Sequence, residues 1–242
     1  MKKLDYISIL AGGSCKFACS FCVGNSIREN ITPHISKKYV SFIKCFGDLT
    51  NSISISGSTS DPYFLDIQYH KEIINACDEV NKKLIHNLHT RQIKDEIKIR
   101  NLIEMYNGTV FSIDETFLST ENLINFKDFS HKKLRFSIVI TKENKDIFNR
   151  EWLDKVSELT GINSFTFRPD VFNHKESISV FGFAHKMKFD YNITEENHNY
   201  GNWFPYKDKF VTFWDNNKIN QNVRYLWSDG NITSDCEWKK LY

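Results

Sequence analysis

The sequence predicts an α/β fold, a partial (β/α)6 barrel with a short aromatic-rich C-terminal extension. Short apolar, β-branched runs alternate six times with longer amphipathic stretches between residue 4 and about residue 170. Such alternation favours parallel strands joined by right-handed crossovers. Six units are fewer than a closed barrel needs, so a partial barrel or an open sheet is expected. Aromatic residues become dense beyond that point, and we predict a core over 1–170 and a cap or strand extension over 171–242.

Each element follows from its own apolar pattern. The predicted strands are YISIL (6–10), SISIS (52–56), LIHNLH (84–89), TVFSI (109–113), LRFSIVI (134–140) and SFTFR (164–168). Apolar residues at helical spacing predict helices over 36–46, 68–83, 94–106, 119–127 and 145–159. Near the C-terminus, Asp229 and Gly230 predict the turn of a hairpin, which would cover an open edge of the sheet.

The composition is that of an ordinary soluble globular protein, with 40% hydrophobic and 26% charged residues among 242. A net charge of +2 makes nucleic acid an unlikely partner. No apolar run approaches the roughly 18 residues of a membrane span. Asp5 and Ser8 interrupt the apolar run of MKKLDYISILAGG, which favours a first strand over a signal peptide. We therefore expect a cytoplasmic protein with no membrane partner.

The six cysteines are clustered, and this argues against a disulfide framework. Cys45 and Cys77 repeat with apolar neighbours at helical spacing, so both are predicted to face the core. The others are Cys15, Cys19 and Cys22 in one turn-rich loop, and Cys236 near the C-terminus. Metal or redox chemistry is the better interpretation of the loop.

The loop cysteines have the spacing C-x3-C-x2-C, with Phe21 before the third. Three thiolates from one loop can bind a [4Fe–4S] cluster and leave one iron without a protein ligand. A structural zinc site would need a fourth ligand, for which His34, Cys236 and the other histidines are candidates, so zinc is the alternative. The loop directly follows the first predicted strand, and in such folds the loops after the strands carry the chemistry.

The motif C-x3-C-x-aromatic-C in this position resembles the signature of the radical S-adenosylmethionine (radical SAM) enzymes, over roughly residues 4–170. The resemblance implies that Cys15, Cys19 and Cys22 ligate a [4Fe–4S] cluster and that S-adenosylmethionine chelates the open iron. In that family an electron from the reduced cluster cleaves the sulfonium, giving methionine and a 5′-deoxyadenosyl radical that abstracts hydrogen. It also implies oxygen sensitivity, a reductant such as flavodoxin or ferredoxin, and a reducing cytoplasm.

The segment SISGSTSDP follows the second strand, where the family has a Gly-Gly-Glu motif that holds the methionine amino group. Here Ser58 and Thr59 follow Gly57, a departure from that motif. Backbone carbonyls and hydroxyls could still accept from an ammonium, with Asp61 as a charged partner. The same segment is also interpreted as a turn and a helix N-cap.

Three later strand ends carry the remaining assignments. FSIDET resembles the family's Ser-x-Asp segment, which implies that Ser112 and Asp114 contact the ribose of the cofactor. Asn144 matches the asparagine often found after the fifth strand. Arg168 closes the sixth strand and could face the methionine carboxylate or the substrate, and a salt bridge to Asp170 is the alternative.

The C-terminal LWSDGNITSDC resembles the opening of the cysteine-rich extension in peptide-modifying radical SAM enzymes, but only Cys236 remains there, so an auxiliary cluster is not expected. We expect the substrate to be a peptide or protein, which includes a glycyl-radical enzyme, or a nucleotide-like small molecule. Two other functions stay open: a non-catalytic zinc-binding module, and a degenerate radical SAM fold that binds the cluster without cleaving the cofactor.

Overall fold

The chain forms two compact units in the computed structural model. The first comprises Met1–Gln92, Glu96–Thr109 and Gln221–Tyr242, and the second comprises Ile93–Asp95 and Val110–Asn220. Within them the structure describes residues 3–17, 19, 22, 31–114, 117, 123–141, 144–169, 196–198, 201–214 and 222–234.

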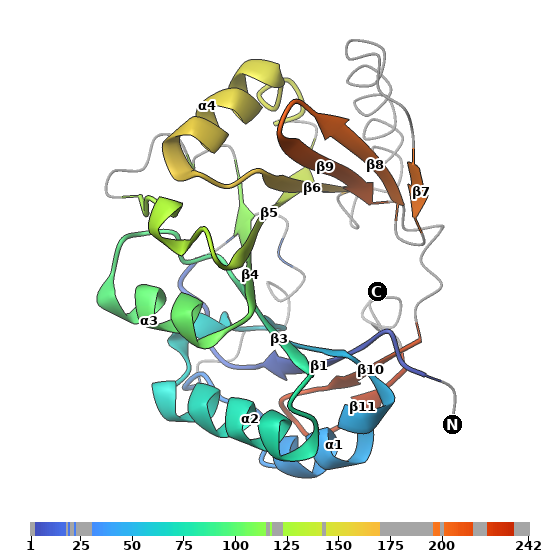
Figure 1. The fold of residues 1–242 in the computed structure, drawn as a ribbon. Coiled ribbons are helices and arrows are strands. Elements are labelled where there is room, and N and C mark those ends of the chain that lie inside the picture. The colour runs from blue at the N-terminus through green and yellow to red at the C-terminus, as the bar shows by residue number, and fades with distance from the viewer. Residues whose placement is uncertain are drawn as a thin grey trace. The chain divides into compact units, whose positions relative to one another are not determined.

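The first unit is built on a mostly parallel sheet with the strand order β11-β10-β1-β2-β3 (Figure 1). Its strands are β1 (Tyr6–Ala11), β2 (Ser52–Gly57), β3 (Ile85–Thr90), β10 (Val223–Leu226) and β11 (Ile232–Thr233). β10, β1, β2 and β3 are parallel, and β11 is antiparallel to β10. The register aligns Ile9 with Ile55 and Ile55 with Leu88, and all three side chains are fully buried. This row of apolar residues forms part of the core of the unit.

Helices of the first unit bury one apolar face each. They are α1 (Tyr39–Phe46), α2 (Ile67–Val80) and α3 (Ile97–Met105), and α1 and α2 lie side by side (Figure 1). α2 begins after Asp66, whose carboxylate accepts from the N–H of Gln68 at 2.8 Å and so caps the helix.

The two helical cysteines differ in environment. Cys77 is fully buried on α2, as predicted. Cys45 is exposed, so the prediction that it faces the core is wrong. α1 buries Tyr39, Phe42 and Ile43. At 100° per residue, Cys45 lies about 110° from the middle of that face, which places it beyond the buried stripe.

The C-terminal hairpin formed by β10 and β11 confirms the prediction. Gly230 adopts a φ of 90°, and its N–H donates to the carbonyl of Trp227 at 2.9 Å. The N–H of Trp227 in turn donates to the carbonyl of Asn231 at 2.9 Å. Because β10 pairs with β1 from Tyr6 onward, the hairpin covers an edge that β1 would otherwise expose.

The second unit has the strand order β5-β6-β9-β8-β7. Its strands are β5 (Lys133–Ile140), β6 (Ser164–Pro169), β7 (Glu196–His198), β8 (Gly201–Tyr206) and β9 (Lys209–Trp214). β5, β6 and β9 are parallel, whereas β9, β8 and β7 are antiparallel. A further strand, β4 (Gly108–Ile113), spans the boundary between the two units.

Aromatic side chains fill the core of the second unit. The ring of Phe136 on β5 packs against those of Phe111 and Phe165, with centroids 6.1 and 5.8 Å away. Helix α4 (Arg150–Thr160) adds Trp152, whose ring lies 6.1 Å from that of Phe165. Asn149 caps this helix by accepting from the N–H of Trp152 at 3.0 Å.

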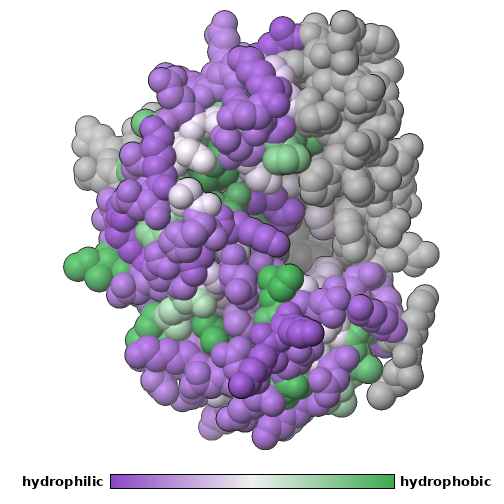
Figure 2. Space-filling model, viewed as in Figure 1, coloured by the Kyte–Doolittle hydropathy of each residue, from purple (hydrophilic) through white to green (hydrophobic). Residues whose placement is uncertain are grey.

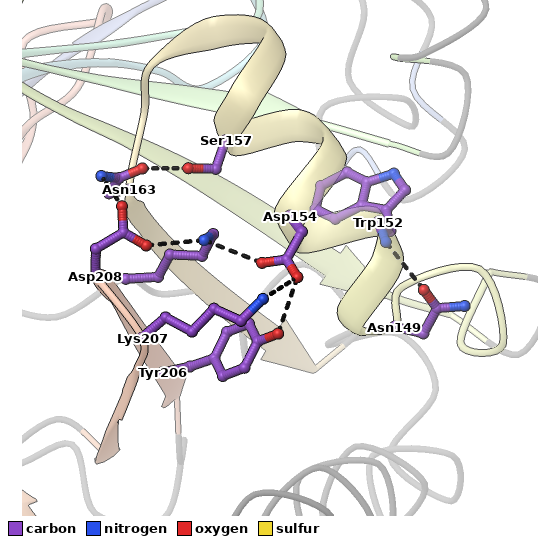
Figure 3. Close-up of polar contacts among 9 residues, drawn as sticks. Asn149, Trp152, Asp154, Ser157, Asn163, Tyr206, Lys207 and Asp208 are labelled. Carbon is purple, nitrogen blue, oxygen red and sulfur yellow. Dashed lines mark hydrogen bonds and ion pairs between the residues drawn. The ribbon is translucent and has the colours of Figure 1, made fainter.

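Figure 3 shows a polar network that joins α4 to the turn between β8 and β9. Asp154 on α4 accepts from the hydroxyl of Tyr206 at 3.0 Å and from Lys207 Nζ at 2.6 Å. Lys209 Nζ lies 3.0 Å from the other oxygen of Asp154 and 2.9 Å from Asp208. Three donors on the hairpin therefore converge on one helical carboxylate.

The predicted fold class is confirmed, since the architecture is mixed α/β with mostly parallel strands, as in a partial barrel. The six predicted strands correspond to β1–β6 with ends shifted by about one residue. In the described part of the helix predicted over 119–127, residues 123–126 are not helical, and Lys127 begins the short 3-10 helix η5 (Lys127–Phe129). Leu123 forms a bridge with Lys94 there instead. The predicted boundary at residue 170 stays a prediction.

The surface of the described residues is mainly hydrophilic in the view of Figure 2, where hydrophobic residues form small separate groups. Within the part of the chain that the structure describes, none of the helices has the length and apolar character needed to cross a membrane.

Candidate cofactor-binding site

The cysteine loop begins at the carboxyl end of β1 and is closed at its base. Gly12 and His34 exchange two backbone hydrogen bonds of 2.9 and 3.0 Å, so the chain leaves and rejoins the strand at one place. Gly13 has a φ of 110°, and a Cβ there would lie 2.9 Å from the Cα of Pro33. Only glycine fits this position without strain.

Cys15 lies in a partly buried position with backbone donors around its sulfur. The backbone N–H groups of Phe17 and Asp61 donate hydrogen bonds to it. Burial raises the pKa of the Cys15 thiol, and the nearby charges of Asp61 and Cys22 raise it further. A bound metal cation would have the opposite effect and favour the thiolate form of Cys15.

The other loop cysteines are also partly buried, and the five described cysteines are free thiols. The N–H of Cys22 donates to the carbonyl of Cys19 at 3.1 Å. Among the residues with described positions, no group of three His, Cys, Asp or Glu side chains is gathered as a metal site. Among the alternative zinc ligands, His34 has its Nδ1 3.1 Å from the carbonyl of Thr32. Cys236 lies outside the described residues.

The loop after β2 is joined to the cysteine loop by side-chain hydrogen bonds. Ser58 donates both its N–H and its hydroxyl to the carbonyl of Ala11, at 2.9 and 3.0 Å. Thr59 Oγ1 accepts from the N–H of Gly13 at 3.0 Å. Ser60 Oγ donates to the carbonyl of Ser14 at 3.0 Å. These bonds join the loop of Ser58 and Thr59 to Ala11, Gly13 and Ser14, the residues directly before Cys15.

Gly57 permits this close approach. A Cβ at Gly57 would lie only 2.3 Å from the carbonyl oxygen of Ser60, so any other residue would push the loop away. The rings of Phe17 and Phe64 add an apolar contact between the two loops, with their centroids 5.2 Å apart.

Asp61 acts as a cap and a connector. Its carboxylate is buried and accepts from the N–H of Tyr63, the hydroxyl of Thr90 and the N–H of Arg91, at 2.8, 2.7 and 2.7 Å. Burial raises the pKa of Asp61, while these hydrogen bonds partly lower it. The N-cap interpretation is confirmed for the short helix η3 (Pro62–Phe64) rather than for α2. Asp61 also links the end of β3 to the surroundings of Cys15.

In the second unit, Ser112 and Asp114 stand at the end of β4, and both are partly buried. Asn144 is buried and shapes the turn after β5. Its side chain donates to the carbonyl of Val139 at 3.0 Å and accepts from the N–H of Thr141 at 2.8 Å. The asparagine singled out after the fifth strand therefore has a structural role in the loop.

Arg168 lies near the end of β6, where the sequence predicts it. Burial and the charge of Arg135 on β5 together lower the pKa of Arg168 to about 10. Sequence reasoning missed Arg135. The alternation in LRFSIVI was the available signal, because Arg135 occupies the face opposite the apolar residues. Asp170, the alternative partner of Arg168, lies outside the described residues.

No protein-family model and no curated protein matches the sequence. The structure resembles solved structures of Streptococcus suis SuiB, a radical SAM enzyme. The match to SuiB bound to precursor peptide SuiA has a TM-score of 0.64 at 13% identity over 98% of this chain. The match to SuiB alone has a TM-score of 0.58 at 13% identity over 98% of this chain. The match to SuiB bound to S-adenosylmethionine has a TM-score of 0.55 at 12% identity over 97% of this chain.

The chain spans 60%, 64% and 58% of the length of these three SuiB chains. At 12–13% identity, the structural similarity shows a shared fold. The cysteine loop lies at the end of β1 within that fold. The chain has the fold of the radical SAM enzyme SuiB over nearly all of its own length.

Proposed function

We propose that the protein is a radical SAM enzyme that uses a [4Fe–4S] cluster to cleave S-adenosylmethionine and abstract hydrogen from a peptide or protein substrate. The observation that carries this proposal is the three-cysteine loop at the end of β1, hydrogen-bonded to the loop after β2 in a SuiB-like fold. When bound, the reduced cluster supplies one electron to the sulfonium, which yields methionine and a 5′-deoxyadenosyl radical that takes a hydrogen atom from the substrate.

The residues of the cysteine loop fit this group. Cys15, Cys19 and Cys22 would each hold one iron, and the backbone N–H groups donating to the Cys15 sulfur would stabilise its thiolate form. Hydrogen bonds to cluster sulfurs raise the reduction potential of such centres.

The cofactor residues are assigned by the family resemblance. Gly57, Ser58 and Thr59 would hold the methionine end, largely through backbone groups, because Ser58 already donates its hydroxyl to Ala11. Ser112 and Asp114 would bind the ribose hydroxyls. Arg168 would bind a carboxylate, either of the cofactor or of the substrate.

The substrate class rests on the similarity to SuiB in complex with its precursor peptide, which favours a peptide over a nucleotide-like small molecule. The electron would come from a small reductant such as flavodoxin or ferredoxin. A reducing cytoplasm suits a centre that must be kept reduced.

Iron and sulfide content after anaerobic reconstitution tests the metal assignment. We expect about four irons and four sulfides per chain with broad visible absorption, as a [4Fe–4S] cluster requires. Serine at Cys15, Cys19 or Cys22 should remove the cluster, whereas Cys45→Ser, at an exposed thiol on α1, should retain it. A colourless protein that binds one zinc would instead support the zinc-binding module.

The replacement of the family's Gly-Gly-Glu by Gly57, Ser58 and Thr59 favours a second candidate, a degenerate fold that binds the cluster without cleaving the cofactor. A reconstituted cluster whose electron paramagnetic resonance spectrum is unchanged by S-adenosylmethionine would support this candidate over the first.

A further inference from the structure

We propose that Arg135 and Arg168 together bind a carboxylate of a peptide substrate. This inference rests on the proposed function, and it names the chemical class that the enzyme recognises.

The two arginines share one face of the second unit's sheet. β5 and β6 are parallel neighbours whose register pairs Ser137 with Thr166 and Val139 with Arg168. Because side chains alternate along a strand, Arg135 lies on the same face of β5 as Ser137. The buried phenylalanines of both strands occupy the opposite face. Arg135, Ser137, Thr166 and Arg168 therefore form a polar row on one face of the two adjacent strands, with Val139 beside Arg168.

This polar row has unsatisfied donors. The Nε atoms of Arg135 and Arg168 and the hydroxyl of Thr166 are buried without a hydrogen-bond partner among the described residues. A buried donor without a partner is costly, and two nearby guanidinium charges add repulsion. Burial lowers the pKa of Arg135, and burial and the Arg135 charge lower that of Arg168, because both effects disfavour the charged form. An anion between them would satisfy the donors and neutralise the repulsion.

A carboxylate fits because a guanidinium group can donate two parallel hydrogen bonds to it. The cofactor is a poor source of this anion, since S-adenosylmethionine carries a sulfonium, an ammonium and one carboxylate, a net charge of about +1. In the proposed complex its one carboxylate would chelate the open iron of the cluster, so the anion between the arginines would come from another molecule. An acidic side chain or the C-terminus of a peptide provides that charge.

Calorimetric titration with two blocked tripeptides tests the proposal. Acetyl-Gly-Glu-Gly-amide and acetyl-Gly-Gln-Gly-amide differ by a single carboxylate. We expect the wild-type protein to bind the glutamate peptide about tenfold more tightly, the change that one charge-assisted hydrogen bond makes. Arg135→Gln and Arg168→Gln should each abolish this preference. Lys133→Gln, at an exposed position of β5 with the same change in charge, should retain it.

Equal binding of the two peptides by the wild-type protein, or an unchanged preference in both arginine variants, would overturn the proposal. Titration with S-adenosylmethionine and its decarboxylated analogue separates the two sources of carboxylate. Should Arg168→Gln erase the discrimination between these cofactors and keep that between the peptides, the pair serves the cofactor and the proposal is wrong.

Thermal unfolding tests whether a variant loses binding only because its fold is destabilised. Removing one of two repelling buried charges should leave the melting temperature of the unliganded protein unchanged or higher. A large decrease in Arg168→Gln, matched by the same decrease in Asp170→Asn, would show a structural salt bridge and contradict the proposal. These readouts need no turnover, so a protein that binds the glutamate peptide but forms no 5′-deoxyadenosine would contradict only the proposed function.

Discussion

The backbone N–H of Gly13 donates to Thr59 Oγ1 at 3.0 Å, across 46 residues of sequence. This bond joins the first residues of the cysteine loop to the loop that the family resemblance assigns to the methionine end of the cofactor. Both partners are constrained, because Gly13 has a positive φ and the loop of Thr59 begins at the tightly packed Gly57. The contact therefore couples the shape of the proposed metal loop to that of the proposed cofactor loop.

Replacing Thr59 tests this coupling. Thr59→Val removes the acceptor at nearly constant volume and leaves the Gly13 N–H without its partner, so we expect a loss of about 1 kcal/mol in the free energy of unfolding. We also expect a lower iron content after reconstitution. Thr59→Ser keeps the hydroxyl and should match the wild-type protein in both measurements. Full iron content and stability in Thr59→Val would show that the bond has no such role.

Asp61→Asn should destabilise the protein by about 1–3 kcal/mol, measured by denaturant unfolding, because an amide cannot accept from all of its present donors. The amide nitrogen, itself a donor, would face either the N–H of Arg91 or the N–H of Tyr63 and the hydroxyl of Thr90. Asp66→Asn is the matched control, since asparagine is also a good N-cap and Asp66 is exposed to solvent at the start of α2. Equal effects of the two substitutions would contradict the role assigned to Asp61.

Protonation of the buried His70 should destabilise the folded protein in mild acid. The imidazole is fully buried, its Nε2 donates to the carbonyl of Pro62 at 3.1 Å and its Nδ1 accepts from the hydroxyl of Tyr106 at 2.7 Å. Burial lowers the pKa of His70 to about 4, from 6.5. The unfolded chain thus binds a proton first, so stability present above pH 6.5 falls as the pH drops toward 4. His70→Gln should flatten the unfolding free energy across this window, and an unaltered pH profile would contradict the assignment.

Protonation of Asp154 should cause a second loss of stability at lower pH. Although burial opposes it, the hydrogen bonds from Lys207, Lys209 and Tyr206 lower the pKa of Asp154 to about 2, from 3.8 (Figure 3). The stability that this network contributes is present above pH 3.8 and is lost as the pH falls toward 2. Asp154→Asn should remove that part of the acid transition without changing the part above pH 4. The same acid profile in both proteins would show that the network contributes nothing.

The local patterns of the sequence predict much of the fold. β-branched runs such as SISIS locate all six core strands, because parallel strands that are covered by helices are apolar and short. Helix ends are less well predicted. α4 starts at Arg150, after the Asn149 cap, rather than at the predicted residue 145, and a cap depends on one side-chain hydrogen bond rather than on the apolar period.

Tertiary contacts explain what the sequence does not reveal. The face that α1 buries is narrower than the apolar pattern suggests, so Cys45 is exposed. The carboxylate of Asp61 accepts a hydrogen bond from Thr90, 29 residues away, and no local motif predicts that contact. Arg135 becomes notable only together with Arg168, and the strand pairing that places the two on one face of the sheet is not encoded in either segment alone.

The formation of 5′-deoxyadenosine from S-adenosylmethionine by the reconstituted, reduced and oxygen-free protein tests the central claim most directly. We predict that the wild-type protein and Cys45→Ser form 5′-deoxyadenosine, and that serine at Cys15, Cys19 or Cys22 abolishes it. Equal 5′-deoxyadenosine formation by the wild-type protein and any of these three loop variants, or none from a wild-type protein with a full complement of iron and sulfide, would contradict the account.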